Sequence, residues 1–193
     1  MTLVRIGIAV VAAMALMAIG AGSASATTLE IGGVTQNKSI AGQASTTGGV
    51  VLAKTDGTEA NTCSESSASG STSVFSGTKV TGSLSELSFK KCVRESIVVD
   101  AKGGLYVEWE SGTTSGNVFS ENAEITVPTG FGFSVTCKTG EGTKIGTVDG
   151  VGSLSAHATM TVNAVLSCGF LLPSATLKAT YKDSAPTGLG VVS

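Results

Sequence analysis

The segment 137–168, CKTGEGTKIGTVDGVGSLSAHATMTVNAVLSC, places two cysteines around strand-like sequence that is interrupted by glycines. An earlier segment, residues 63–92, also begins and ends with cysteine and has a similar span and similar contents. Short runs rich in β-branched residues and bounded by Gly, Ser and Asp are typical of strands joined by turns. The sequence therefore predicts two cysteine-bounded β units that pack together.

The cysteines predict two disulfides, because an even number of them in a chain bound for an oxidising compartment is normally paired. Three connectivities are possible. We favour Cys63 with Cys92 and Cys137 with Cys168, since each pair then joins the ends of one strand-turn-strand unit. Each pair closes a loop of about 30 residues, worth about 3.5 kcal/mol in the chain-entropy model.

The spacing of the cysteines argues against metal binding. No two of them form a C-x-x-C half-site, and the chain has a single histidine, so the ligands of a structural zinc site are missing. We expect no metal and no cofactor.

Residues 1–26 have the organisation of a cleaved signal peptide. Arg5 precedes an apolar run at 6–21, and Ala24-Ser25-Ala26 supplies the small residues that signal peptidase requires. The run is about 16 residues long, whereas a spanning helix needs roughly 20. We expect cleavage after Ala26, no membrane anchor after cleavage, and a secreted protein of the cell envelope or the extracellular medium.

The remaining residues, 27–193, fit one domain of ordinary size. We expect a thinly apolar N-terminal lead-in at 27–49 and a single β domain at 50–193. Loss of Arg5 with the signal peptide changes the formal net charge from −2 to −3. A charge this small does not indicate a nucleic-acid partner.

The fold class follows from the alternation of large and polar residues and from short links rich in Gly, Ser and Thr. These links are too short for the helix of a parallel crossover, so antiparallel strands are expected. About ten such strands in one open sheet would leave exposed edges. We therefore predict an all-β, antiparallel β-sandwich or barrel of about ten strands with two disulfides.

Several local features are predicted within this domain. A hairpin is expected from β-branched and aromatic arms at 97–99 and 105–110 around a glycine-bearing loop at 100–104. Other expectations are a serine-rich loop at 64–73, a hairpin turn at Asp149-Gly150, and a strand at 153–165. From the alternation we expect Leu105, Val107, Trp109, Leu154, Met160, Leu177 and Tyr181 inside, and Glu108, Glu110, His157, Lys178 and Lys182 outside.

Few residues have the arrangement of a catalytic site. His157 would have to serve any serine or cysteine triad, but it falls on the polar face of its expected strand and the chain has no G-x-S-x-G elbow. Glu108 and Glu110 share a strand face about 7 Å apart, a separation that an inverting glycosidase could use. Nothing in the sequence indicates a cleft between them, so we interpret them as a solvated face and assign no catalytic residue.

Four stretches carry a resemblance to known proteins: ANTC at 60–63, SVTCKTGEGT at 134–143, NAVLSCGFLLPSATLKATYK at 163–182 and SAPTGLGV at 184–191. With the paired cysteines they resemble secreted, β-rich hypothetical proteins of actinobacteria, for which no activity is established. A fainter likeness, in Gly- and Thr-rich strands with spaced cysteines, is to secreted activators of alkane oxidation. This likeness implies a cell-surface or surfactant-like role.

Three functional hypotheses remain. The first is an exported, non-catalytic protein whose Ser- and Thr-rich strands contact a surface or a cell-surface partner. The second is a small-molecule or carbohydrate-binding module with a mouth near Tyr106 and Trp109, and the third is a secreted hydrolase that uses Glu108 or Glu110. A deep pocket that holds a second acid opposite Glu108 would favour the third, and a solid core with flat faces would favour the first.

Overall fold

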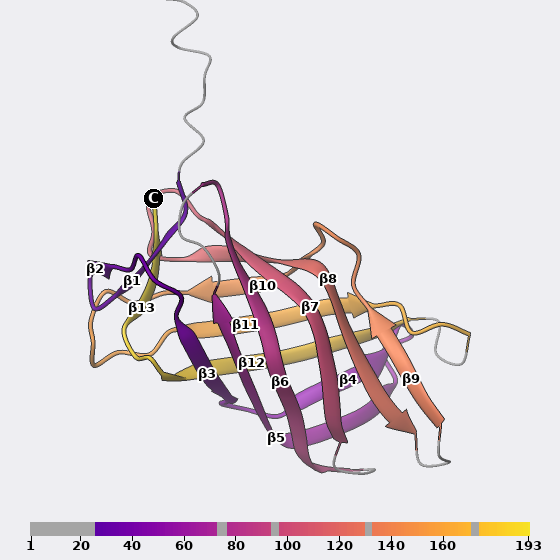
Figure 1. Cartoon of the computed structure of the whole chain (residues 1–193). Helices are drawn as coiled ribbons and strands as arrows, with labels where there is room; N and C mark the ends of the chain where they lie inside the picture. Colours follow the sequence, from indigo (N-terminus) through magenta and orange to yellow (C-terminus); the bar gives the residue numbers. More distant parts are fainter. Residues whose placement is uncertain (1–25, 73–76, 94–96, 130–132, 171–173) are drawn as a thin grey trace, which may run out of the picture.

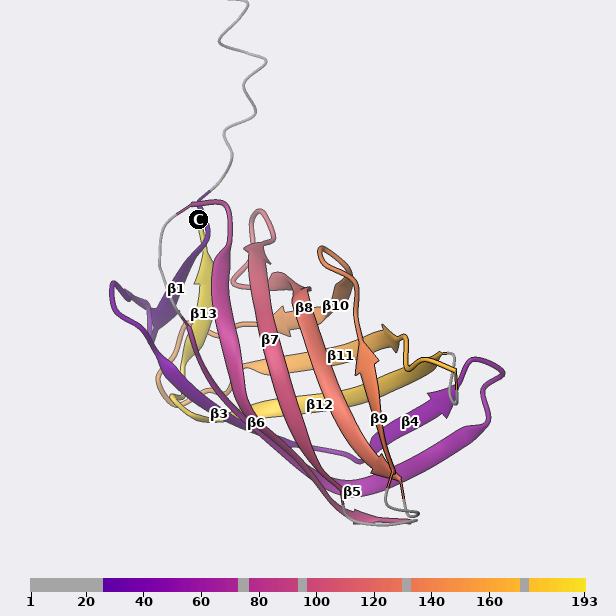
Figure 2. The ribbon, with the colours of Figure 1, turned by 45° about the vertical axis from the view of Figure 1, so that its right-hand side comes forward.

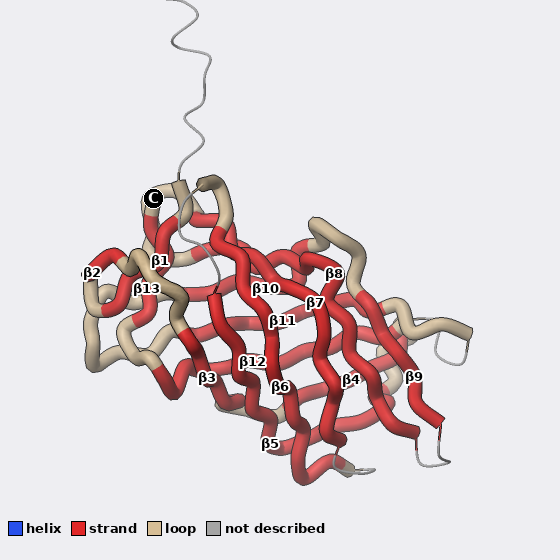
Figure 3. Tube along the Cα trace, in the orientation of Figure 1, coloured by secondary structure: helices blue, strands red, loops and turns tan. Residues whose placement is uncertain are grey.

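The computed structural model describes residues 26–72, 77–93, 97–129, 133–170 and 174–193. Within these ranges all regular structure is β-strand, as predicted (Figure 3), and no helix is long and apolar enough to cross a membrane. The expected signal peptide lies almost entirely outside the described residues. The strands are β1 Thr28–Ile31, β2 Val34–Thr35, β3 Ala41–Thr46, β4 Val50–Lys54, β5 Glu59–Thr72, β6 Val80–Cys92, β7 Ile97–Trp109, β8 Gly116–Thr129, β9 Phe133–Lys138, β10 Lys144–Asp149, β11 Thr159–Leu166, β12 Ala175–Ala185 and β13 Leu189–Val192.

The main sheet has ten antiparallel strands and follows the order β10-β11-β12-β3-β5-β6-β7-β8-β9. β4 also pairs with β12 and β5. β3 and β4 therefore both lie between β12 and β5, at different positions along these two strands. β8 also pairs with β10, which closes the sheet on itself. In Figure 1 β6 to β9 run steeply in front while β10 to β12 cross behind them, and the core lies between these two layers. A sheet closed in this way is a barrel, which is one of the two predicted architectures.

Both disulfides have the favoured local pairing. Cys63 and Cys92 lie directly opposite each other on β5 and β6. Cys137 on β9 is bonded to Cys168, which follows β11. Beside this second bond, Lys138 and Ser167 exchange two backbone hydrogen bonds of 2.8 Å. The second disulfide therefore links β9 to the end of β11. These strands are far apart in the strand order, so the disulfide closes the sheet at a second place, in addition to the pairing of β8 with β10.

A small sheet, β13-β1-β2, covers one end of the main sheet (Figure 2). β1 comes from the expected lead-in and pairs with β13 at the other end of the chain. Its buried Leu29 faces the core, as does Val191 of β13. The lead-in also provides β3, which lies within the main sheet between β12 and β5.

Most side chains lie on the predicted side of the sheet. Leu177 and Tyr181 are buried, Leu105, Val107, Trp109 and Met160 are partly buried against the core, and Glu110, Lys178 and Lys182 are exposed. Glu108, which was expected outside, is half-buried.

Two expectations near the start of β11 are wrong. Leu154, predicted inside, is 63% exposed, and His157, predicted outside, is half-buried. The reason is that the strand begins at Thr159, whereas the preceding residues form a connection in which the Ala156 N–H donates to the Ser153 carbonyl. Leu154 lies instead over Gly32, in the turn between β1 and β2, where a Cβ on the glycine would be 2.3 Å from the leucine Cγ.

The predicted hairpin within 97–110 is also wrong, because these residues belong to one continuous strand, β7, that pairs with β8. The register shifts between Lys102 and Gly104, and Gly103 has a φ of +88°. A Cβ at Gly103 would lie 2.2 Å from the carbonyl oxygen of Asn122 on β8. The glycine that we assigned to a turn therefore makes a β-bulge, in which only glycine fits readily.

The expected serine-rich loop is part of strand β5 up to Thr72. Its serines form hydroxyl pairs with serines of β6, and such cross-strand pairs stabilise a sheet. The pairs are Ser67–Ser88 at 2.8 Å, Ser69–Ser85 at 3.1 Å and Ser71–Ser83 at 3.4 Å.

The Asp149-Gly150 pair does not make a tight hairpin turn. β10 ends at Asp149, and β11 starts only at Thr159. Gly150 instead packs closely against a neighbouring loop, because an added Cβ would lie 2.0 Å from the Thr114 carbonyl oxygen.

Candidate functional site

A cavity of about 250 Å³ lies inside the main sheet, under the small sheet. Leu29 of β1 and Leu189 and Val191 of β13 line it from the small sheet. The rest of its lining comes from both layers of the main sheet, chiefly from β3, β5, β6, β7 and β12. The cavity is thus bounded by segments from the whole length of the described chain.

The cavity exists because small residues occupy neighbouring inward positions. On β3 these are Gly42 and Ala44, on β5 Ala68 and Gly70, and on β6 Gly82. β3, β5 and β6 are adjacent in the sheet, so the small residues form one continuous area of the wall. A larger side chain at Ala44 or Ala68 would occupy part of this space. A Cβ at Gly70, by contrast, would lie 2.4 Å from the Ser83 carbonyl oxygen, and one at Gly82 would lie 3.3 Å from the Ser71 carbonyl oxygen.

The remainder of the wall consists mainly of aliphatic side chains. The cavity is partly open to solvent, and an apolar wall of this kind favours apolar molecules over water, because ordered water needs several polar partners. The principal aliphatic residues are Leu29, Val80, Leu84, Leu105, Val107, Val118, Val148, Met160 and Val191.

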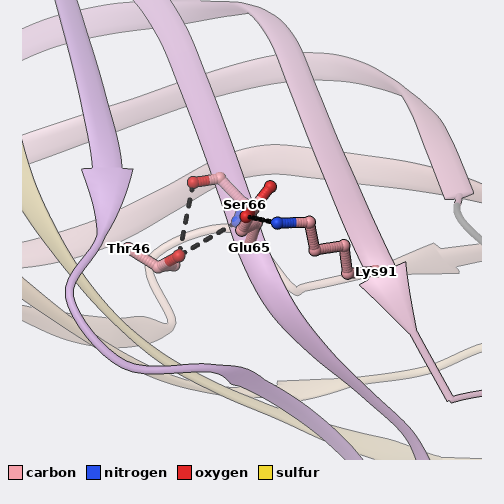
Figure 4. A network of polar contacts seen from close by, with 4 residues as sticks. All are labelled: Thr46, Glu65, Ser66 and Lys91. Atoms are coloured by element: carbon pink, nitrogen blue, oxygen red, sulfur yellow. Dashed lines mark hydrogen bonds and ion pairs between the residues drawn. The ribbon is translucent and has the colours of Figure 1, made fainter.

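Tyr181 brings one polar group to this wall, but that group is already paired. Its hydroxyl lies 3.0 Å from the Ser66 hydroxyl, and the Ser66 N–H donates to Thr46 Oγ1 at 3.0 Å (Figure 4). Burial raises the pKa of the Tyr181 phenol above its ordinary value, while the hydrogen bond with Ser66 acts in the opposite direction. The phenol therefore stays neutral and contributes a mostly apolar surface.

Asp183, two residues further along β12, is an acidic residue among those that line the cavity. Its side chain is only 10% exposed, and its Oδ2 is buried with no hydrogen-bond partner among the described residues. His157 Nδ1 lies 2.9 Å from Asp183 Oδ1 and 2.7 Å from the Asp183 carbonyl oxygen. Both oxygens are acceptors, so Nδ1 must carry the hydrogen. His157, whose side chain is 35% exposed, thus forms a partly buried polar pair with Asp183.

The Glu pair weighed for hydrolysis lies elsewhere. Glu108 is half-buried and Glu110 is exposed, and neither lines the cavity. Catalytic carboxylates of glycosidases must flank the bond that is cleaved. The cavity therefore gives these two residues no such role.

The two aromatic residues weighed as a mouth lie on opposite faces of β7. Tyr106 stacks on Phe119 with ring centroids 5.0 Å apart, and Lys79 Nζ lies 4.3 Å from the Tyr106 centroid. Trp109 packs against the core, and its Nε1 donates to the Thr113 carbonyl oxygen at 2.8 Å. The cavity is lined by neither ring.

No group of three or more His, Cys, Asp or Glu side chains within the described ranges could hold a metal ion. Comparison with protein-family models, with curated proteins and with solved structures finds no match for this chain. The suggested likeness to secreted actinobacterial proteins therefore stays a prediction, and the function has to be argued from the cavity.

Sequence reasoning missed the cavity, although one signal for it was present. Ile40, Gly42, Ala44 and Thr46 alternate with more exposed residues along β3, but two of these inward positions carry almost no side chain. An alternating strand with Gly and Ala on its inner face leaves space unless a neighbour fills it. Whether a neighbour does so depends on the register of β5 and β6, which the sequence does not reveal.

Proposed function

We propose that this chain is an exported, non-catalytic protein that binds a small apolar molecule in the cavity of its main sheet. The observation that carries the proposal is the apolar cavity of about 250 Å³ inside an otherwise packed fold. Cavities of this size in cores are normally filled by side chains, since empty space costs stability. A retained apolar space is the usual form of a small-molecule site.

The volume limits the size of the ligand. A cavity of about 150 Å³ accepts benzene, so by proportion one of 250 Å³ accepts roughly ten non-hydrogen atoms. Burial of eight methylene carbons contributes about 6 kcal/mol at about 0.8 kcal/mol each. This corresponds to a Kd of the order of 10 to 100 µM. Linear or compact hydrocarbon chains of about eight carbons match this space.

Export is part of the same proposal. It is supported by the Ala24-Ser25-Ala26 pattern and by two disulfides, which form and persist in oxidising compartments. The chain also packs into the fold directly after the expected cleavage point. Ala26 is exposed, Thr27 is buried, and β1 begins at Thr28.

Calorimetric titration with 1-octanol tests the proposal. The Ala44→Leu variant adds three carbons on the cavity side of β3, whereas Ala41→Leu makes the same change at an exposed position of the same strand. We expect wild type and Ala41→Leu to bind octanol alike, and Ala44→Leu to lose at least tenfold in affinity. Absence of octanol binding to the wild type, or equal binding by the two variants, would contradict the proposal.

A further inference from the structure

Thr27, the residue that directly follows the expected cleavage point, is buried and hydrogen-bonded. Its exposed fraction is 1%, whereas Ala26 before it is exposed. The Thr27 N–H donates to the Gly77 carbonyl oxygen at 2.7 Å. The Thr27 hydroxyl donates to the Thr78 carbonyl oxygen at 2.7 Å and accepts from the Trp109 N–H at 3.1 Å. The bond that signal peptidase is expected to cut therefore ends at a residue that the fold holds by three hydrogen bonds.

This burial limits access to the bond between Ala26 and Thr27. Proteases cut exposed or locally unfolded segments, because the residues around the cut bond must enter the active site of the protease. In the folded chain Thr27 would first have to leave its place. Each hydrogen bond lowers the population of such an open form about fivefold, so three lower it roughly a hundredfold. The rate of cleavage follows that population.

The strand that follows Thr27 depends on a late segment of the chain. β1 starts at Thr28 and pairs with β2 and with β13, in which Val192 lies opposite Thr28 (Figure 2). β13 follows every other described strand in the sequence. The N-terminal signal leads an exported chain across the membrane, so residues 189–192 cross long after the cleavage point. We therefore expect the cleavage point to stay accessible during most of export.

The same strand pair supplies part of the cavity wall. Leu29, two residues after Thr27, lines the cavity from β1, and Val191 lines it from β13. Leu29 and Val191 lie directly opposite each other in the small sheet. Docking of this segment therefore buries Thr27 and completes the cavity in one step.

We infer that the fold buries its own processing site: signal peptidase cuts after Ala26 only while Thr27 is undocked, and docking then encloses the new N terminus. In the cut, water adds across the bond between the Ala26 carbonyl carbon and the Thr27 nitrogen. The products are a carboxylate on Ala26 and an α-amine on Thr27, which keeps the nitrogen that donates to the Gly77 carbonyl oxygen. This inference rests on the proposed function, because the cleavage point is part of the proposed export.

Cleavage of the purified precursor, residues 1–193, by signal peptidase in detergent micelles tests the inference. The precursor is compared in its folded, disulfide-bonded form and in a form that is kept unfolded by reduction and alkylation of its cysteines. A matched variant carries a flexible Gly-Ser linker of about ten residues between Ala26 and Thr27, which moves the cut away from the fold. Fluorescence of Trp109, the single tryptophan, shows whether the fold persists in the micelles.

We expect the folded wild-type precursor to be cut roughly a hundredfold more slowly than the folded linker variant. The alkylated wild-type precursor should be cut about as fast as the linker variant, and mass spectrometry should place each cut after Ala26.

Two substitutions identify the contacts responsible, each corrected by the rate of its own alkylated form. Thr27→Ala removes both hydrogen bonds of the hydroxyl, so its folded precursor should be cut about 25 times faster than the folded wild type. Thr28→Ala is the control, because it removes only the longer hydrogen bond of 3.3 Å to the Val192 carbonyl oxygen. Its folded precursor should gain less than about fivefold.

The possible results separate this inference from the proposed function. Equal rates for the folded wild type and the folded linker variant would overturn the inference and leave the proposed export standing. A folded linker variant that is cut as slowly as the folded wild type would also overturn it, since burial of Thr27 would then not be the cause. Absence of a cut after Ala26 even in the alkylated precursor would overturn the cleavage point itself, and with it the export part of the proposed function.

Discussion

Removal of the Cys137–Cys168 disulfide should both lower stability and open one closure of the sheet. The double variant Cys137→Ala/Cys168→Ala releases a loop with a sequence separation of 31 residues. The chain-entropy model gives about 3.5 kcal/mol for a loop of that length. For a domain of this size, such a loss lowers the Tm by about 7 to 14 °C.

The structure adds a local effect that the entropy model does not contain. Lys138 and Ser167 lie next to the disulfide, and their two backbone hydrogen bonds are outside the regular strand pairings. Cys63–Cys92 encloses a similar loop, with a separation of 29, but it crosses the long β5–β6 pairing. Cys63→Ala/Cys92→Ala is therefore a matched control, because the chain-entropy model predicts the same loss of stability for both double variants.

Urea unfolding and amide hydrogen exchange measure the two effects. Both double variants should lose about 3.5 kcal/mol. Only Cys137→Ala/Cys168→Ala should lose protection at the amides of Lys138 and Ser167, which then exchange many times faster than in the wild type. Unchanged protection of these amides in that variant, or a loss of stability below about 1 kcal/mol, would refute the view that this disulfide holds the sheet closed.

Two further substitutions test the packing of the sheet. Tyr181→Phe removes the hydrogen bond with Ser66 and should cost about 1 to 2 kcal/mol at neutral pH in urea unfolding. Burial raises the pKa of Tyr181 in the folded state, so its contribution is fully present below the ordinary tyrosine pKa of about 10 and is lost as the pH rises above it. Stability should thus fall more steeply above pH 10 in the wild type than in Tyr181→Phe, and parallel curves would count against this. Gly103→Ala and Gly57→Ala both place a side chain at positive φ, but only Gly103 has a backbone oxygen within 2.2 Å of the new Cβ, whereas Gly57 has open space. Gly57→Ala should cost about 1 kcal/mol and Gly103→Ala at least twice as much, and equal losses would show that the bulge does not require glycine.

Alternation and cysteine spacing were sufficient to predict the fold class, the disulfides and the inner face of β12. In that strand, Leu177 and Tyr181 are buried and Lys178 and Lys182 are exposed, as predicted. Such patterns are reliable because each strand face meets one environment along its whole length. Conversely, the start of β11 could not be predicted. The alternation extends back to Leu154, but Leu154 packs on Gly32 between β1 and β2 and lies outside the strand.

Turn-forming residues misled the prediction where their partners lie on other strands. Gly103 was taken for a turn, yet it makes a bulge opposite Asn122, and serines taken for a loop are bonded across β5 and β6. The pair of His157 and Asp183 is separated by 26 residues and depends on the packing of a loop against β12. The cavity likewise depends on which small residues become neighbours. These features follow from strand register, which local sequence specifies only weakly.

The central claim is that the cavity is a binding site, and methyl NMR tests it most directly. With methyl-labelled protein and 1-octanol, nuclear Overhauser effects report which methyl groups contact the ligand. We predict effects from octanol to Leu29, Val80 and Leu105, which line the cavity, and none to Val165, which is 59% exposed on the outer face of β11. Effects confined to exposed residues such as Val165, or none at all at saturating octanol, would contradict the account.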